Sequence, residues 1–182
     1  MDQRGATRLM VLFLTTLLVP QAHATEGPKL GNRAPDFTLP YATMDTIDRA
    51  GLTLSKAIGA RNIILAFYPA DWSGGCTKEM CTMRDNIGSL AELGAEVYGI
   101  SGDYVYSHHE WAKHHSLQFP LLSDHNHEVA TAYASFNPTS GYNRRTVYVV
   151  DRSGYIAYVD LEYSVRTPES FEKLKAALAT LK

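Results

Sequence analysis

The two cysteines of the 182-residue chain lie five positions apart in YPADWSGGCTKEMC, residues 68–81. Two neighbouring thiols form either a structural disulfide or a reactive pair. Cys76 and Cys81 follow a Gly-Gly pair, and apolar residues at helical spacing follow them, so we expect both to lie on one helix. Five helical residues rise about 7.5 Å and leave the two Cα atoms about 8–9 Å apart.

That separation argues against a structural disulfide. A relaxed disulfide requires Cα atoms within about 7 Å of each other. A bond between Cys76 and Cys81 therefore requires the helix to unwind. A disulfide that unwinds its own helix is poorly suited to stabilise the fold. The spacing favours thiol chemistry.

Cys76 is the better nucleophile of the two by position. A thiol in the first turn of a helix faces unpaired N–H groups and the positive end of the helix dipole, which stabilise the thiolate. Gly74 and Gly75 leave the backbone open to a small polar substrate, although a Gly-Gly pair alone is more often only a turn. Helical spacing turns Cys76 inward and Cys81 toward a wetter flank.

The elements that hold this segment alternate in type. NIILAF, residues 62–67, is a continuous apolar run, typical of a strand covered on both faces. A helix is expected from Cys76 to Leu93, stopped by Gly94. Further patterns predict strands over 95–100 and 119–124, and helices over 105–116 and 128–133.

The last quarter of the chain predicts a hairpin and a helix. TVYVV, residues 146–150, and YIAYVDLE, residues 155–162, flank the turn DRSG. Pro168 opens a final helix with one apolar face, made of Phe171, Leu174, Ala177, Leu178 and Leu181. Strands that alternate with helices and then close with a hairpin and a helix indicate an α/β fold.

The first residues read as a secretory signal peptide. Arg4 and Arg8 precede an apolar run over residues 9–19, and Ala22-His23-Ala24 provides a cleavage site. We expect a signal peptide over residues 1–24, one domain over residues 25–182, and an exported, periplasmic protein. The net charge of −2, with no long run of either sign, indicates no nucleic-acid binding and no membrane binding after cleavage.

Several segments carry a resemblance to a known family. YPADWSGGC is similar to the active-site segment of peroxiredoxins, P-x-x-x-[TS]-x-x-C, and the four residues between the cysteines resemble the bacterioferritin comigratory protein or peroxiredoxin Q branch. GNRAPDFTLP, FPLLSD and RTVYVVDRSG also resemble family segments, in the family's order. The resemblance covers nearly all of residues 28–182. It implies a thioredoxin-like fold with a central mixed β-sheet flanked by helices.

The resemblance also implies a role for each matched residue. Cys76 would be the peroxidatic cysteine, which Pro69 would shield. The Ser73 hydroxyl and the Arg145 guanidinium would both stabilise the charge that develops on the departing oxygen. Glu79 matches an acidic position that orients this arginine. Ser73 stands where threonine is usual, and it keeps the hydroxyl but lacks the methyl group that helps to hold its rotamer.

The implied reaction needs no cofactor and no metal. Cys76 would reduce hydrogen peroxide or an organic hydroperoxide and become a sulfenic acid. Cys81 would act as the resolving cysteine and form an intramolecular disulfide. A thioredoxin-like protein reductant would then reduce that bond. The enzyme would be a monomer or homodimer.

Two other functions fit two nearby cysteines. A thioredoxin-like thiol-disulfide oxidoreductase uses C-x-x-C, which this chain lacks, and a copper-binding assembly factor uses C-x-x-x-C with a distant histidine. Six histidines between positions 108 and 127 suggest a metal site, but none are four apart, so we expect a solvated helix face. Trp72 lies inside the catalytic segment. Asp103 resembles a family position at a strand end, with turn formation as the equal alternative.

Overall fold

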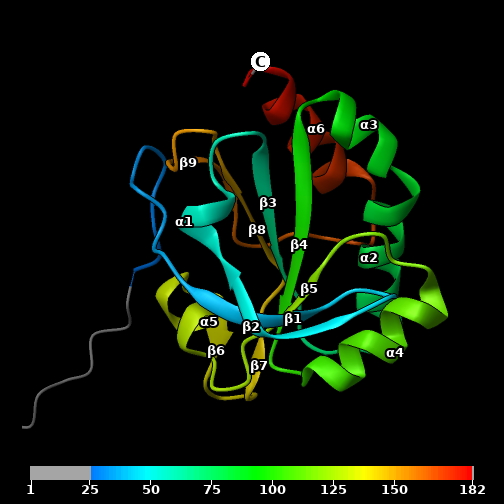
Figure 1. The fold of residues 1–182 in the computed structure, drawn as a ribbon. Coiled ribbons are helices and arrows are strands. Elements are labelled where there is room, and N and C mark those ends of the chain that lie inside the picture. The colour runs from blue at the N-terminus through cyan, green and yellow to red at the C-terminus, as the bar shows by residue number, and fades with distance from the viewer. Residues whose placement is uncertain (1–25, 182) are drawn as a thin grey trace, which may run out of the picture.

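A computed structural model describes residues 26–181, and the expected signal peptide lies outside them. A seven-stranded mixed sheet forms the centre, in the order β2-β1-β5-β4-β3-β8-β9. Its strands are β1 (Thr38–Ala42), β2 (Ile47–Thr53), β3 (Asn62–Phe67), β4 (Ala95–Ser101), β5 (Leu121–Ser123), β8 (Thr146–Val150) and β9 (Ile156–Asp160) (Figure 1). The short strands β6 (Phe136–Asn137) and β7 (Tyr142–Asn143) pair separately.

Helices cover both faces of this sheet. They are α1 (Leu54–Ala57), α2 (Gly74–Asp85), α3 (Ile87–Glu92), α4 (Val105–His115), α5 (Glu128–Ala132) and α6 (Glu169–Ala179). Helices α2, α3 and α6 lie on one side, and α1 and α5 lie on the other (Figure 1). The expected mixed sheet flanked by helices is confirmed.

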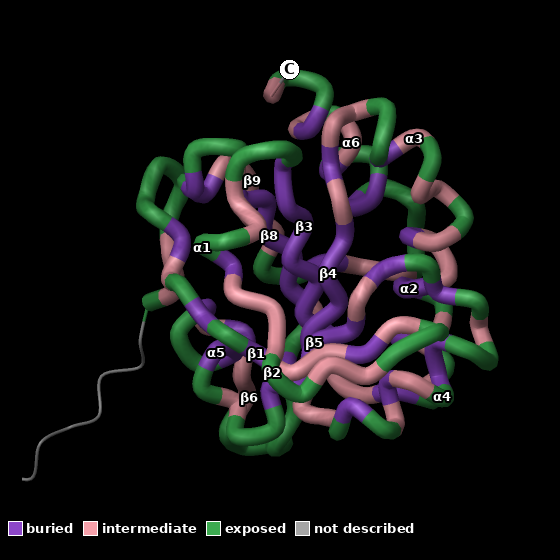
Figure 2. The backbone as a smooth tube through the Cα atoms, in the orientation of Figure 1, coloured by how far each residue is buried: buried purple, intermediate pink, exposed green. Residues whose placement is uncertain are grey.

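Strand β3 is the buried centre of the fold. It pairs in parallel with β4 and antiparallel with β8, and all six of its residues are buried, as the purple tube of Figure 2 shows. Ile64 and Ala66 face one hydrophobic cluster, whereas Ile63, Leu65 and Phe67 face the other. This two-sided burial explains the continuous apolar run and confirms the predicted strand.

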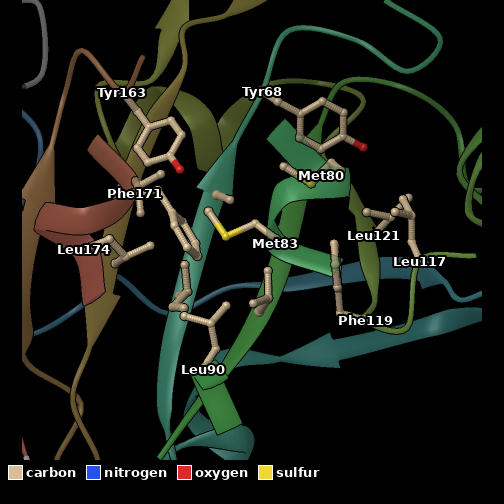
Figure 3. Close-up of a cluster of buried hydrophobic side chains, with 14 of the residues drawn as sticks. Tyr68, Met80, Met83, Leu90, Leu117, Phe119, Leu121, Tyr163, Phe171 and Leu174 are labelled. Atoms are coloured by element: carbon tan, nitrogen blue, oxygen red, sulfur yellow. The ribbon is translucent and has the colours of Figure 1, made fainter. Parts of the chain in front are cut away.

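The cluster on the α2 side fixes the helix that carries both cysteines. Met80 and Met83 of α2 pack with Leu90 of α3 and with Phe171 and Leu174 of α6 (Figure 3). All five side chains are nearly or fully buried. Burying one such side chain contributes roughly 1.5–3 kcal/mol, so this face anchors the middle of α2 to the sheet.

The prediction of one helix from Cys76 to Leu93 is wrong. The chain forms α2 and α3, separated at Asn86, whose φ of −110° and ψ of 11° leave the helical range. The Asn86 side chain donates to the Thr82 carbonyl at 2.9 Å, and its backbone N–H donates to the Met83 carbonyl at 3.3 Å. Asparagine competes in this way with the regular helical bonds and ends helices.

The sequence patterns did not predict the hairpin of β1 and β2. Strand β2 is an edge strand with exposed Arg49 and Ala50, so it lacks a continuous apolar run. Pro40 has no N–H to donate, and the pairing register shifts between Leu39 and Tyr41. These features hide both strands from a pattern search.

Within residues 26–181, none of the helices combines the length and the apolar character that crossing a membrane requires.

Candidate active site

The site begins where β3 ends. Tyr68 is fully buried after the strand, and residues 69–73, which we call the catalytic loop, lead into α2. Ser73 is the N-cap of α2, with extended backbone angles, and its Oγ accepts from the Cys76 N–H at 3.4 Å. Cys76 therefore lies in the first turn, where helix N–H groups and the helix dipole favour negative charge.

The Cys76 sulfur is buried and receives two hydrogen bonds. Cys76 is 0% exposed. The Ser73 hydroxyl donates to its Sγ at 2.7 Å, and Arg145 Nη2 donates to the same atom at 3.3 Å. Donors that converge on one sulfur stabilise the thiolate over the thiol.

Arg145 reaches the sulfur from the start of the strand that lies next to β3 in the sheet. It directly precedes β8, and its carbonyl accepts from the Tyr163 N–H at 3.1 Å. A Cβ on Gly75 would lie 2.6 Å from Arg145 Nη2, so only glycine allows this approach. Gly74 faces open space, so the structure imposes no such requirement there.

Glu79 holds the other side of Arg145. Glu79 is 0% exposed, and Arg145 Nη1 donates to its Oε2 at 2.5 Å. Burial raises the pKa of Glu79 to about 7, although the charge of Arg145 works against that rise. Burial lowers the pKa of Arg145, but the charges of Glu79 and Cys76 outweigh it, so the net shift is upward.

Cys81 lies apart from this group, on the outer flank of α2. It is a free thiol and half-buried, so the first thiol faces inward and the second faces outward, as predicted. Arg84, three residues on, donates to the His115 carbonyl at 2.6 Å and pairs with Asp85 at 2.7 Å. Both cysteines belong to one unbroken helix, whose geometry holds their Cα atoms about 8–9 Å apart.

Pro69 is the remaining predicted site residue. It is half-buried directly after Tyr68 and lines a cleft of about 220 Å³ with Asp103, His125 and Tyr142, among others. Ser73, Cys76, Glu79 and Arg145 thus meet around one sulfur. The shielding of that sulfur by Pro69 stays a prediction.

The expectation that the histidines form a solvated helix face is wrong for His108. This residue is 0% exposed and contacts Asp71, a second buried polar residue that the sequence did not single out. The spacing of Val105, His108, Trp111 and Ala112 places them on the buried face of α4, and that period was the available signal. Among residues 26–181, no group of three or more His, Cys, Asp or Glu side chains could hold a metal ion.

Asp103 has a structural role next to the site. Its Oδ2 accepts from the Asp71 N–H at 2.9 Å and from the Ser101 hydroxyl at 2.8 Å. Trp72 is 54% exposed in the catalytic loop.

A buried thiol at the start of a helix, directly after the central strand of a mixed sheet and bonded by arginine and serine, defines a thiol-reactive site on an α/β fold. A model described as the AhpC/TSA family matches residues 30–159, and the chain belongs to that family.

Curated relatives carry the peroxiredoxin name. A putative chloroplastic peroxiredoxin Q of Oryza sativa subsp. indica is 41% identical over 133 residues, which are 71% of this chain and 57% of the rice protein. The chain therefore spans little more than half the length of that relative. A putative peroxiredoxin of Mycobacterium tuberculosis is 36% identical over 155 residues, 82% of this chain and 94% of the relative.

Solved structures give the same result for the fold. Peroxidoxin BcpB from Mycobacterium tuberculosis matches with a TM-score of 0.75 and 30% identity, over 85% of this chain and 99% of that one. Enterococcus faecalis AhpC matches with a TM-score of 0.73 and 26% identity, over 82% and 92%. The predicted peroxiredoxin family and thioredoxin-like fold are confirmed.

Proposed function

We propose that the protein is a thiol peroxidase that reduces hydrogen peroxide and organic hydroperoxides through Cys76. The observation that carries this proposal is the pair of donors on one buried sulfur, Ser73 Oγ at 2.7 Å and Arg145 Nη2 at 3.3 Å. These donors favour the thiolate, and they point to the place where a peroxide oxygen would approach it. Membership of a family whose named relatives are peroxiredoxins supports the same reaction.

In the first step, the Cys76 thiolate attacks one peroxide oxygen and the O–O bond breaks. The sulfur becomes a sulfenic acid, and the other oxygen leaves as water or an alcohol after taking a proton. Arg145 and Ser73 stabilise the negative charge on the departing oxygen. Glu79 holds Arg145 in place, and Pro69 shields the thiolate from bulk water.

In the second step, the Cys81 thiolate attacks the sulfenic sulfur. The S–O bond breaks, hydroxide leaves as water after protonation, and a Cys76–Cys81 disulfide forms. The first turns of α2 unwind to bring the sulfurs together, because the intact helix keeps them too far apart. Helix ends open at low free energy, which makes this step accessible.

A thioredoxin-like protein then reduces the disulfide by two electrons. Cys81 is half-buried on the outer flank of α2, and Trp72 exposes half of its surface in the catalytic loop, so a protein partner can approach both. The reaction uses no cofactor, and the enzyme works as a monomer or homodimer. The signal-peptide pattern of residues 1–24 supports a periplasmic location. A protein recovered from the periplasmic fraction with an intact mass beginning at Thr25 is the expected result.

The test is peroxide consumption by the purified protein. We expect turnover of hydrogen peroxide and of an alkyl hydroperoxide with thioredoxin, thioredoxin reductase and NADPH. Failure to consume either peroxide with any dithiol would contradict the proposal. A copper titration in the same preparation separates the copper-binding alternative, since tight stoichiometric copper binding without peroxide consumption would favour it.

A further inference from the structure

A buried pair of ionisable side chains lies against the catalytic loop, and the proposed reaction does not use it. Asp71 belongs to the loop, and His108 comes from α4, 37 residues away in sequence. Both side chains are 0% exposed, and His108 Nδ1 lies 2.9 Å from Asp71 Oδ2. A buried polar pair of this kind is kept only when its members satisfy each other.

The neighbours of the pair define where its hydrogens lie. Asp71 Oδ1 accepts from the Tyr68 hydroxyl at 2.8 Å, and Asp71 Oδ2 accepts from the Ser107 hydroxyl at 2.7 Å. Two hydroxyl donors therefore converge on this carboxyl group, and a hydrogen on His108 Nδ1 would make a third. A carboxylate accepts only, which matches this set of neighbours.

The other ring nitrogen of His108 also faces an acceptor. His108 Nε2 lies 3.2 Å from the Leu122 carbonyl oxygen of β5, which cannot donate. Nδ1 faces Asp71 Oδ2, and the Tyr68 hydroxyl at 3.4 Å is committed to Asp71 as a donor. Both ring nitrogens therefore face oxygen atoms, and a ring with a hydrogen on each nitrogen would donate to both of them.

This pair is one of several contacts that hold the catalytic loop. The Asp71 N–H donates to Asp103 Oδ2 at 2.9 Å, and Trp72 Nε1 donates to Ser107 Oγ at 3.2 Å. Trp72 has a φ of 59°, a left-handed conformation that non-glycine residues rarely adopt. Such a conformation persists where the surroundings over-determine it, and the next residue is Ser73, which donates to the Cys76 sulfur.

We propose that His108 is a positioning residue: its buried ion pair with Asp71 holds the catalytic loop so that the Ser73 hydroxyl points at the Cys76 sulfur. The inference rests on the proposed function, in which Cys76 is the reacting thiol. Tyr68 from the end of β3 and Asp103 after β4 are the other titratable groups of this network.

The ion pair itself is tested in the unmodified protein. Nitrogen-15 NMR of the histidine side chains at pH 7 should show hydrogens on both Nδ1 and Nε2 of His108, with slow exchange because the ring is buried. A His108 ring with one nitrogen free of hydrogen would overturn the proposal. This readout does not depend on peroxide chemistry or on a variant that folds.

The positioning role is tested with Asp71→Asn. The amide is the same size, its oxygen can accept from the Tyr68 hydroxyl and its nitrogen can donate to a neutral His108 ring, so the packing survives while the charge pair and the bond from the Ser107 hydroxyl are lost. We expect the rate constant for Cys76 oxidation by hydrogen peroxide to fall about tenfold to a hundredfold, as for other small misplacements of catalytic groups. His109→Gln is the matched control: His109 contacts the Thr43 carbonyl and not the catalytic loop, so this variant should leave the rate unchanged.

A double-mutant cycle with Ser73→Ala separates positioning from general structural damage. If the ion pair acts through the Ser73 hydroxyl, Asp71→Asn should have little further effect in the Ser73→Ala background. Equal slowing in both backgrounds, or an unchanged rate for Asp71→Asn alone, would overturn the positioning role. An unmodified protein that fails to react with peroxide would instead overturn the proposed function, and the NMR spectrum would still decide the ion pair.

Discussion

The surroundings of Cys76 and Cys81 differ sharply, although both residues lie on α2. Cys76 is 0% exposed, and a serine hydroxyl and a guanidinium donate to its sulfur. Cys81 is half-buried on the outer flank of the helix, one turn from an arginine that binds Asp85 and the His115 carbonyl. The same side chain is therefore buried and hydrogen-bonded at one position and partly exposed five residues later.

This difference fits our proposal that the two thiols act in successive steps. The Cys76 sulfur is fully buried, whereas Cys81 is partly exposed at the surface. Helix α2 is weakest at its start, because its first two residues, Gly74 and Gly75, have low helix propensity. Beyond them, Met80 and Met83 are fixed in the core. Unwinding is therefore expected at the Cys76 end of α2.

The largest expected effect comes from Cys76→Ser. An alcohol is a far weaker nucleophile than a thiolate, so peroxide reduction should be abolished. Stopped-flow measurement of peroxide consumption checks this, with Cys81→Ser as the matched cysteine control. Turnover close to that of the unmodified protein would show that Cys76 is not the reacting thiol.

Arg145→Ala should be the next most damaging change. Loss of the guanidinium removes a donor to the thiolate and to the departing oxygen, so the rate of Cys76 oxidation should fall roughly 10²–10³-fold. The exposed neighbour Arg144 offers a control, and Arg144→Ala should react normally. An Arg145→Ala protein that is folded and fully reactive would show that burial alone distinguishes the two thiols.

The raised pKa of Glu79 predicts that the stability of the folded protein depends on pH. Burial raises its pKa from 4.5 to about 7 in the folded protein, so the folded state holds the proton more tightly than the unfolded state does. The contribution of Glu79 to the free energy of unfolding is therefore largest below about pH 4.5. It declines as the pH rises to about 7 and is constant above that. The total change is up to about 3 kcal/mol.

The measurement is urea denaturation between pH 4.5 and 8 in a Cys76→Ser background, where no thiol titrates beside Arg145. Adding Glu79→Gln should remove the decline between pH 4.5 and 7. Parallel stability curves for the two proteins would show that Glu79 remains ionised throughout this range.

Cys81→Ser should have the smallest effect on the first turnover. Because Cys81 lies outside the Cys76 pocket, one equivalent of peroxide should be reduced at a normal rate. The protein should then stall as a sulfenic acid and over-oxidise with excess peroxide, which mass spectrometry detects. Normal repeated turnover with a dithiol protein would show that one cysteine is sufficient.

Local patterns were enough to predict most elements near the site. The two-sided burial of β3 and the helical period of α2, α4 and α6 are visible in the order of apolar residues. The break between α2 and α3 at Asn86 is not visible in that order, because it depends on one side chain that bonds to the Thr82 carbonyl. Pro40 and the exposed face of β2 concealed the first hairpin.

Some features of the site could likewise be predicted from local motifs, and others depend on the fold. Motifs close to the residues concerned predicted Cys76, Ser73 and Arg145, which the structure brings together, whereas Cys81 lies apart from them on the same helix. The contact between Asp71 and His108 joins residues 37 positions apart, and only the folded sheet brings them together. Residue type alone does not distinguish a buried histidine from a solvated one. The position of His108 in the helical period of α4 does.

Hydrogen exchange across the redox cycle tests the sequential use of the two thiols most directly. The reduced protein and the protein oxidised with one equivalent of hydrogen peroxide would be compared by mass spectrometry, with the disulfide mapped in parallel. A Cys76–Cys81 disulfide should form, with faster exchange over residues 74–84 and unchanged protection over residues 62–67. A disulfide with α2 exchange unchanged, or oxidised protein without this bond, would contradict the account.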